Sequence, residues 1–123
     1  ILGVEGFDKS LAEGTMLLTP YASDAQDEKT QAFVSEYKEK FNDTPNQFAA
    51  DTYDAMLIIK EAAEKAGVTP DMSVSDICEA MKTAMTEITF DGLTGEGMTW
   101  SADGEPAKAP KAMKIVDGAY TAM

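Results

Sequence analysis

Three amphipathic helical stretches follow one another in the middle of this chain, and only short strand-like segments flank them. Phe33, Tyr37 and Phe41 recur at intervals of four, which predicts a helix that starts near Ser23 or Asp24, both common N-cap types. Such a helix must bury its apolar stripe against another element. The need for covering elements is therefore the strongest constraint on the fold.

The second predicted helix is the longest, over residues 46–66, and Gly67 terminates it. Its apolar positions recur at spacings of three and four: Ala49, Tyr53, Met56, Ile59, Ala63 and Ala66. A third helix is predicted from Ser73, where Asp76 completes a capping box. Its apolar face carries Ile77, Met81 and Met85.

Strands are predicted only as short pieces around these helices. The segments are residues 1–4, 15–19, 88–90, 98–100 and 111–116, with one helical turn over 9–13. The fold class is therefore α/β, but three helices have too few strands to cover their apolar faces. The chain also opens with Ile1 in an apolar stretch. Together these features predict a piece of a longer chain.

The charge composition excludes several classes of function. Of 123 residues, 22 are acidic and all ten cationic residues are lysine, with no histidine or arginine and a formal charge of −12. No histidine-based catalytic triad or metal site can form, and nucleic acid is an unfavourable partner. No cofactor is expected. The single cysteine, Cys78, is expected to be buried as a small apolar residue.

Segment 91–97 was weighed for two kinds of site. Asp91 to Glu96 lacks the alternating oxygen ligands of a calcium-binding loop, so metal binding is not expected there. Glycines 92, 95 and 97 lead into a predicted strand instead of a helix, so a phosphate loop is not indicated either. We expect a flexible connection between strands. The acidic residues also leave a carboxylate-pair hydrolase open, although no spacing singles out a pair.

Glu5 follows the first predicted strand and precedes Gly6. Ligands bind at the carboxyl ends of strands in open α/β sheets, and a carboxylate there suits a cationic group such as an ammonium. An ordinary turn glutamate is the alternative.

Several motifs together resemble one protein family. They are Ile1–Gly6, Gly14–Met16 with Thr19-Pro20-Tyr21, Phe33-Val34 with Tyr37, Phe41 and Pro45, Ala49-Ala50 with Tyr53-Asp54-Ala55, Lys65–Gly67, Phe90–Gly95 with Trp100 and Asp103-Gly104, and Asp117–Tyr120. In order and spacing they resemble the C-terminal third of the periplasmic branched-chain amino acid-binding proteins of ABC transporters. The resemblance implies part of a type I periplasmic-binding-protein fold, in which two α/β lobes close on a ligand.

The resemblance also implies a division of the chain. Residues 1–18 and 98–123 would belong to one lobe and residues 24–90 to the other. Two crossing segments, residues 19–23 and 91–97, would connect the lobes. Thr19, Pro20 and Tyr21 would act as a hinge.

By the same resemblance, Glu5 binds the α-ammonium of the ligand and Phe48 packs on its side chain, with a core role as the alternative for Phe48. The implied function is non-enzymatic: an extracytoplasmic solute-binding protein that delivers an amino acid, branched-chain or otherwise apolar, to an ABC permease. Localisation would be periplasmic, or extracellular with a membrane anchor. A ligand-sensing regulatory domain is the alternative within the fold. The missing N-terminal part, or a second copy, would cover the exposed apolar faces.

Overall fold

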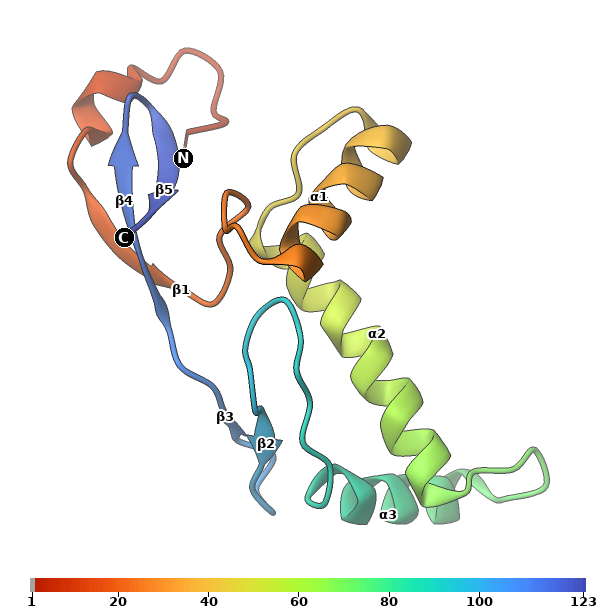
Figure 1. The fold of residues 1–123 in the computed structure, drawn as a ribbon. Coiled ribbons are helices and arrows are strands. Elements are labelled where there is room, and N and C mark those ends of the chain that lie inside the picture. The colour runs from red at the N-terminus through yellow and green to blue at the C-terminus, as the bar shows by residue number, and fades with distance from the viewer. Residues whose placement is uncertain (1) are drawn as a thin grey trace. The chain divides into compact units, whose positions relative to one another are not determined.

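The computed structural model describes residues 2–123, which form two compact units. Unit 1 comprises Ile1–Gln47 and Pro110–Met123, and unit 2 comprises Phe48–Ala109. The elements are, in order, η1 (Lys9–Ala12), β1 (Met16–Thr19), α1 (Glu28–Phe41), α2 (Gln47–Ala66), α3 (Val74–Met85), β2 (Thr99–Trp100), β3 (Pro106–Ala107), β4 (Lys111–Val116) and β5 (Ala119–Ala122) (Figure 1). This mixture of helices and short strands confirms the α/β class.

The chain passes between the units at residues 47–48 and 109–110. Segments 19–23 and 91–97 each lie inside one unit, so these boundaries differ from the predicted lobe boundaries, which stay a prediction. Within residues 2–123, no helix combines the length and apolar character needed to cross a membrane.

Unit 1 is built on an antiparallel sheet of order β1-β4-β5. Along β4, Met113 and Ile115 are buried while their neighbours are not, the period-two pattern of a sheet with one covered face. Ile115 packs with Leu2 and Ala12 from the N-terminal segment. The turn between β4 and β5 has positive φ at Asp117 and at Gly118, which an Asp-Gly pair adopts readily.

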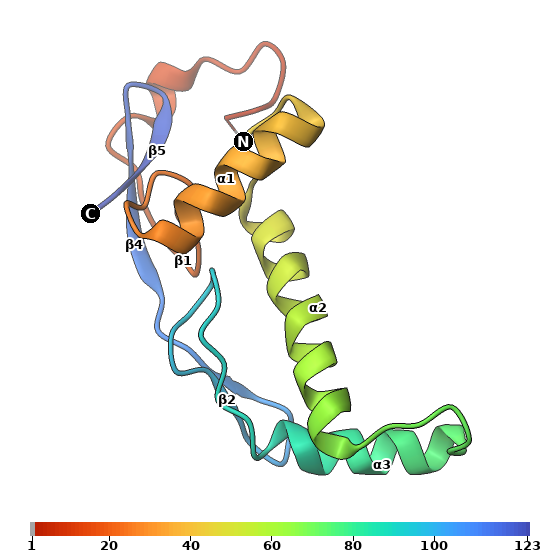
Figure 2. The ribbon, with the colours of Figure 1, turned by 45° about the vertical axis from the view of Figure 1, so that its right-hand side comes forward.

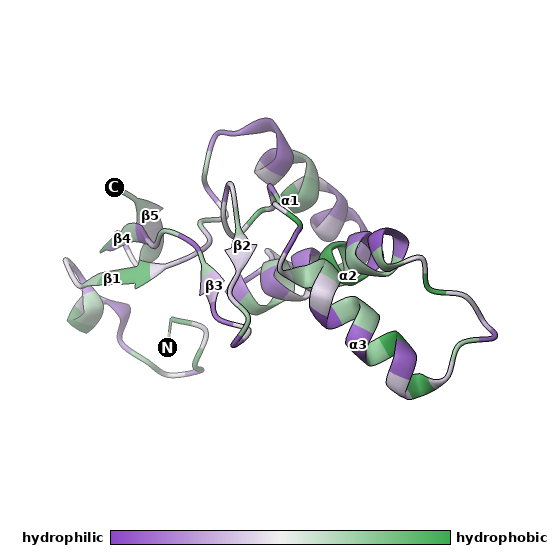
Figure 3. Ribbon diagram, turned by 90° about the horizontal axis from the view of Figure 1, so that it is seen from below, coloured by the Kyte–Doolittle hydropathy of each residue, from purple (hydrophilic) through white to green (hydrophobic). Residues whose placement is uncertain are grey.

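Unit 2 is built on α2 and α3, which follow one another in Figure 2. Ala62 of α2, Ala84 of α3 and Ile88 form its apolar cluster, and Trp100 packs against it. Green and purple segments alternate along α3 in Figure 3, as expected for a helix with one apolar side. β2 and β3, near the C-terminal end of this unit, form an antiparallel pair.

The helix ends follow local side-chain chemistry. Ser73 caps α3 by accepting a hydrogen bond from the Asp76 amide at 3.2 Å, which confirms the predicted start of this helix. The Asp76 carboxylate accepts the Ser73 hydroxyl at 2.7 Å and not its backbone amide, so the second bond of a capping box is replaced by a side-chain contact. The predicted start of α1 is wrong, because Asp27 is its N-cap and accepts from the Thr30 amide at 2.9 Å. Asp24 lies before the helix, and its Oδ2 accepts the Ala122 amide of β5 at 3.1 Å. Ser23 lies before the helix as well.

Two predicted strands do not form. Residues 2–6 are turns and bends, and Ile1 lies outside the described residues. A strand needs a hydrogen-bonding neighbour, and residues 2–6 pair with none of the strands described. Residues 88–90 contribute only one bridge, Phe90 to Met98. Strand β3 was not among the predicted strands.

The buried side of α2 also differs from the prediction. Ala50, Asp54 and Ala62 are buried, whereas Met56 and Ile59 are 63% and 51% exposed. The small side chains and the carboxylate allow close approach of other segments, so they occupy the packed side in place of the larger apolar residues. The expectation of a buried Cys78 is likewise wrong, since this residue is exposed on α3.

Candidate functional site

Glu5 lies in the turn-rich segment 2–6 of unit 1, and its side chain is exposed. The next residue, Gly6, has a φ of +78°, and the Phe7 amide donates to the Val4 carbonyl at 3.2 Å. Glu5 therefore projects from a tight turn and not from the end of a strand. A carboxylate in this position is open to solvent and to a ligand.

Phe48 is the second residue of α2 and the first residue of unit 2. Its side chain is 74% exposed, so it takes no part in the core of the described residues. One turn later, the Thr52 hydroxyl donates to the Phe48 carbonyl at 2.8 Å. The backbone that carries the exposed ring is thus held in regular helix.

The Thr19-Pro20-Tyr21 segment begins at the last residue of β1, and the Thr19 hydroxyl is hydrogen-bonded within unit 1. The Thr19 hydroxyl is 2.8 Å from Gln47 Oε1, to which it donates, and it accepts from the Tyr21 amide at 3.3 Å. Thr19 and Tyr21 are 6% and 4% exposed. This segment is therefore fixed to the first residue of α2 by a buried hydroxyl.

The Tyr21 ring packs edge-on against Phe33 at a centroid distance of 6.3 Å. Its hydroxyl is buried and has no hydrogen-bond partner among the described residues. Burial, together with the nearby negative charge of Asp27, raises the pKa of Tyr21 to about 12. Tyr21 therefore remains a neutral phenol across the physiological range.

Segment 91–97 of unit 2 is held by a residue that the sequence analysis treated only as part of a motif. Asp54 of α2 is 2% exposed, and its two carboxylate oxygens accept the Leu93 amide at 3.0 Å and the Thr94 amide at 2.8 Å. The only sequence signal is that Asp54 interrupts an apolar helix. The expectation of a flexible connection is thus wrong for the middle of this segment.

Segment 91–97 is also contacted by a residue that follows it in the sequence. Lys108 lies 3.2 Å from the Thr94 hydroxyl and 3.4 Å from Asp51 Oδ1. At the segment's end, Asp91 Oδ1 accepts the Gly97 amide at 2.6 Å. Among residues 2–123, no group of three acidic or cysteine side chains is arranged to hold a metal ion.

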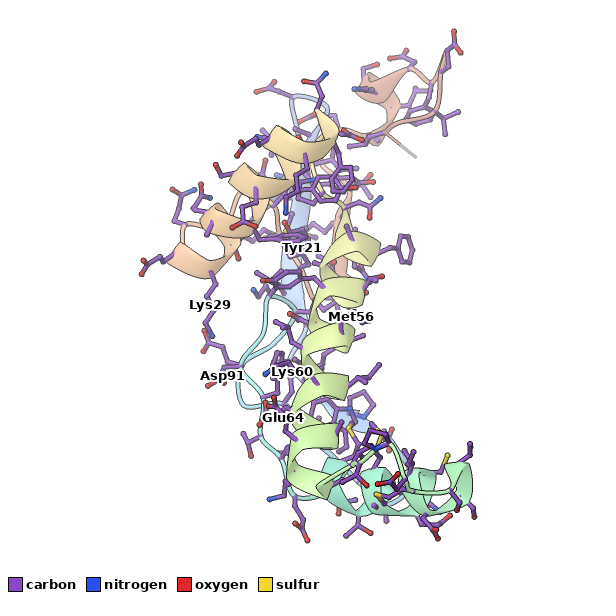
Figure 4. The ribbon with its side chains drawn as sticks, turned by 90° about the vertical axis from the view of Figure 1, so that its right-hand side faces the viewer. Tyr21, Lys29, Met56, Lys60, Glu64 and Asp91 are labelled. Atoms are coloured by element: carbon purple, nitrogen blue, oxygen red, sulfur yellow. The ribbon has the colours of Figure 1, made fainter. Side chains whose placement is uncertain are left out.

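The side of α2 away from this packing is exposed and partly apolar. Met56, Lys60 and Glu64 follow one another at intervals of four along it (Figure 4). Lys60 and Glu64 form an ion pair at 3.0 Å, with both side chains about two-thirds exposed. Met56 and Ile59 provide apolar area on the same helix.

The family model described as periplasmic binding protein matches residues 3–119, almost the entire chain. No curated protein sequence gives a significant match. The family match extends over both units and includes Glu5, Phe48 and both predicted crossing segments.

Solved structures give the same result for the fold. A branched-chain amino acid ABC transporter periplasmic ligand-binding protein from Burkholderia xenovorans is 19% identical, with a TM-score of 0.78 over 100% of this chain and 33% of its own. A leucine-binding protein from Thermotoga maritima is 25% identical, with a TM-score of 0.69 over 91% of this chain and 30% of its own. A solute-binding protein from Rhodopseudomonas palustris in complex with benzoate is 19% identical, with a TM-score of 0.71 over 91% and 29%. The chain spans about a third of the length of each of these proteins.

Proposed function

The chain belongs to the periplasmic binding protein family, and we propose that it is the C-terminal part of an extracytoplasmic solute-binding protein that delivers an apolar amino acid to an ABC permease. The match over residues 3–119 carries this proposal. The relatives are solute-binding proteins and not enzymes, in agreement with a chain that has no histidine. The fold is that of the type I periplasmic binding proteins, as the motifs suggested.

The proposed ligand site uses Glu5 and Phe48. A zwitterionic amino acid presents an ammonium, and an exposed carboxylate can pair with it through charge-assisted hydrogen bonds. An exposed phenyl ring offers an apolar surface to the ligand side chain, and the 74% exposure of Phe48 supports this role over a core role. In this proposal segments 19–23 and 91–97 connect the two lobes.

An aromatic carboxylate is the second candidate ligand, because one structurally similar protein was solved with benzoate. The chemistry of Glu5 discriminates between the two candidates. Benzoate carries only a negative charge, so a nearby carboxylate would repel it, whereas an amino acid brings its own cation. Glu5 therefore favours an amino acid.

Replacing Glu5 tests the proposed ammonium site. We expect Glu5→Ala, in the full-length protein, to weaken leucine binding at least tenfold, since removing a charge-assisted hydrogen bond costs about 1.5–3 kcal/mol. Isothermal calorimetry with leucine and benzoate measures the effect, and Glu39→Ala on exposed α1 is the matched control. Unchanged leucine affinity, or tighter binding of benzoate than of leucine by the wild type, would contradict the assignment.

Replacing Phe48 tests the apolar contact. We expect Phe48→Ala to change the order of affinities among leucine, valine and phenylalanine with little loss of melting temperature, because the ring is largely exposed. Phe41→Ala, which removes another exposed ring, should leave the order unchanged. A loss of stability of about 3–5 kcal/mol with an unaltered order would assign Phe48 to the core.

A further inference from the structure

The buried carboxylate of Asp54 makes two contacts that are unusual for their distance along the chain. Its oxygens accept amides 39 and 40 positions later, from Leu93 and Thr94. Each amide has a separate oxygen, so the two bonds fix both the position and the orientation of the peptide between them. Charge-assisted hydrogen bonds of this kind are among the stronger ones in proteins. Leu93 and Thr94 are themselves 5% and 2% exposed.

Gly92 allows this approach, and Gly95 leaves room for Met98 in the same turn. A Cβ at Gly92 would lie 2.5 Å from Asp54 Oδ2, and a Cβ at Gly95 would lie 2.8 Å from Met98 Cγ. Neither glycine has a positive φ, so close approach, and not backbone freedom, explains them. The Gly92 amide also donates to the Gly95 carbonyl at 2.8 Å, which closes a turn over the carboxylate. The turn over residues 92–95 therefore has room for the Asp54 carboxylate and two amides that bind it.

We propose that Asp54 is a positioning residue for ligand binding, which fixes residues 92–95 to α2 so that closure bends the chain only outside this pinned turn. The inference rests on the proposed function, because it takes 91–97 as a connection between lobes. Phe48 begins the same helix six residues earlier, about 9 Å along the axis. Asp54 thereby ties residues 92–95, which do not bend, to the helix that carries the proposed ligand contact.

This role predicts an effect on the lifetime of the complex more than on ligand preference. Without the hydrogen bonds from Leu93 and Thr94 to Asp54, residues 92–95 can take more conformations. The closed form of the protein is then less favoured and reopens faster. Asp54 does not contact the ligand in this proposal, and the order of ligand affinities should therefore persist. Phe48, by contrast, should change the order.

The test uses Asp54→Asn in the full-length protein. Asparagine keeps the size but offers one acceptor oxygen, and its amide would face a second N–H donor. Glu64→Gln is the control on the exposed side of the same helix, where the ion pair to Lys60 is lost instead. Gly92→Ala is the second variant, since its methyl group displaces the carboxylate without changing charge.

Stopped-flow dissociation of leucine or benzoate, whichever binds the wild type, is measured together with amide hydrogen exchange of Leu93 and Thr94. We expect Asp54→Asn or Gly92→Ala to speed dissociation at least fivefold, to accelerate both exchanges and to leave the order of ligands unchanged. Glu64→Gln should alter the dissociation rate less than twofold. Faster exchange with an unchanged dissociation rate would overturn the positioning role and leave a purely structural one. A wild type that binds neither ligand would refute the proposed function itself and the inference with it.

Discussion

The two predicted crossing segments are held in place by opposite strategies. Segment 19–23 of unit 1 is fixed by a neutral hydroxyl, Thr19, whose contacts reach two residues ahead and the first residue of α2. Segment 91–97 of unit 2 is fixed by a buried carboxylate on a helix about 40 residues away. The first arrangement is mostly local and uncharged, whereas the second depends on a distant helix presenting the correct side. Two segments that the sequence predicts to play the same role therefore differ greatly in how they depend on the rest of the fold.

The largest expected effect belongs to the carboxylate. Asp54→Ala should lower the free energy of unfolding by about 3 kcal/mol, because two buried amides lose their acceptor. Gly92→Ala alone should cost about 2 kcal/mol through its clash with Asp54, as overpacking does. The double variant should cost less than the sum, because the alanine at 54 leaves room for the new methyl group.

Urea unfolding of the wild type, both single variants and the double variant measures this cycle. If the losses of unfolding free energy were strictly additive, Asp54 would not require a glycine at position 92. Segment 91–97 would then not depend on a close contact with a distant helix, which is its main difference from segment 19–23.

A smaller effect is expected at the hydroxyl. Thr19→Val keeps the shape but removes the donor to Gln47 and the acceptor of the Tyr21 amide. We expect a loss of about 1–2 kcal/mol in urea unfolding, typical of a buried neutral group left without its partner. Thr15→Val, at an exposed position directly before β1, is the control. A loss as large as that of Asp54→Ala would erase the distinction between the two strategies.

The smallest effect concerns an exposed carboxylate, Asp27, which contrasts with buried Asp54. Burial alone would raise the pKa of Asp27, but the hydrogen bonds from Thr30 and the charge of Lys111 outweigh it and lower the pKa below its usual 3.8. A lowered folded-state pKa means that the stabilisation is present above about pH 4 and is lost as the pH falls through the folded value.

Comparison with Asp27→Ser isolates this cap, because serine caps a helix without titrating. The wild type should be more stable than Asp27→Ser by about 0.5 kcal/mol at pH 7, and the difference should shrink below pH 4. Thermal unfolding between pH 3 and pH 7 measures it. A difference that is constant over this range would show that the charge of Asp27 contributes nothing.

The sequence predicted those features that depend on neighbouring residues. The start of α3 at Ser73 and the end of α2 before Gly67 were each correct, because a local hydrogen bond or a positive φ determines them. The strand over residues 1–4 was wrong, because strand formation depends on a partner far along the chain. The start of α1 was wrong because Ser23, Asp24 and Asp27 are all common N-cap types, and only Asp27 accepts the Thr30 amide.

The residues of the candidate site also differ in how far the sequence alone could identify them. Glu5 and Phe48 were selected through motif resemblance, and their roles remain predictions. Asp54 was overlooked because its importance comes from residues 39 and 40 positions away, which no helical periodicity reveals. The apolar pattern of α2 was also misleading, since a helix with two apolar sides does not indicate which one is packed.

The exposed Cys78 has a practical consequence for spectroscopy. It is the only cysteine in the chain, and Trp100 is the only tryptophan. Both belong to unit 2, with Trp100 packed on the apolar cluster and Cys78 accessible on α3. A fluorescent acceptor attached to Cys78 would therefore report, by energy transfer from Trp100, on the integrity of one unit.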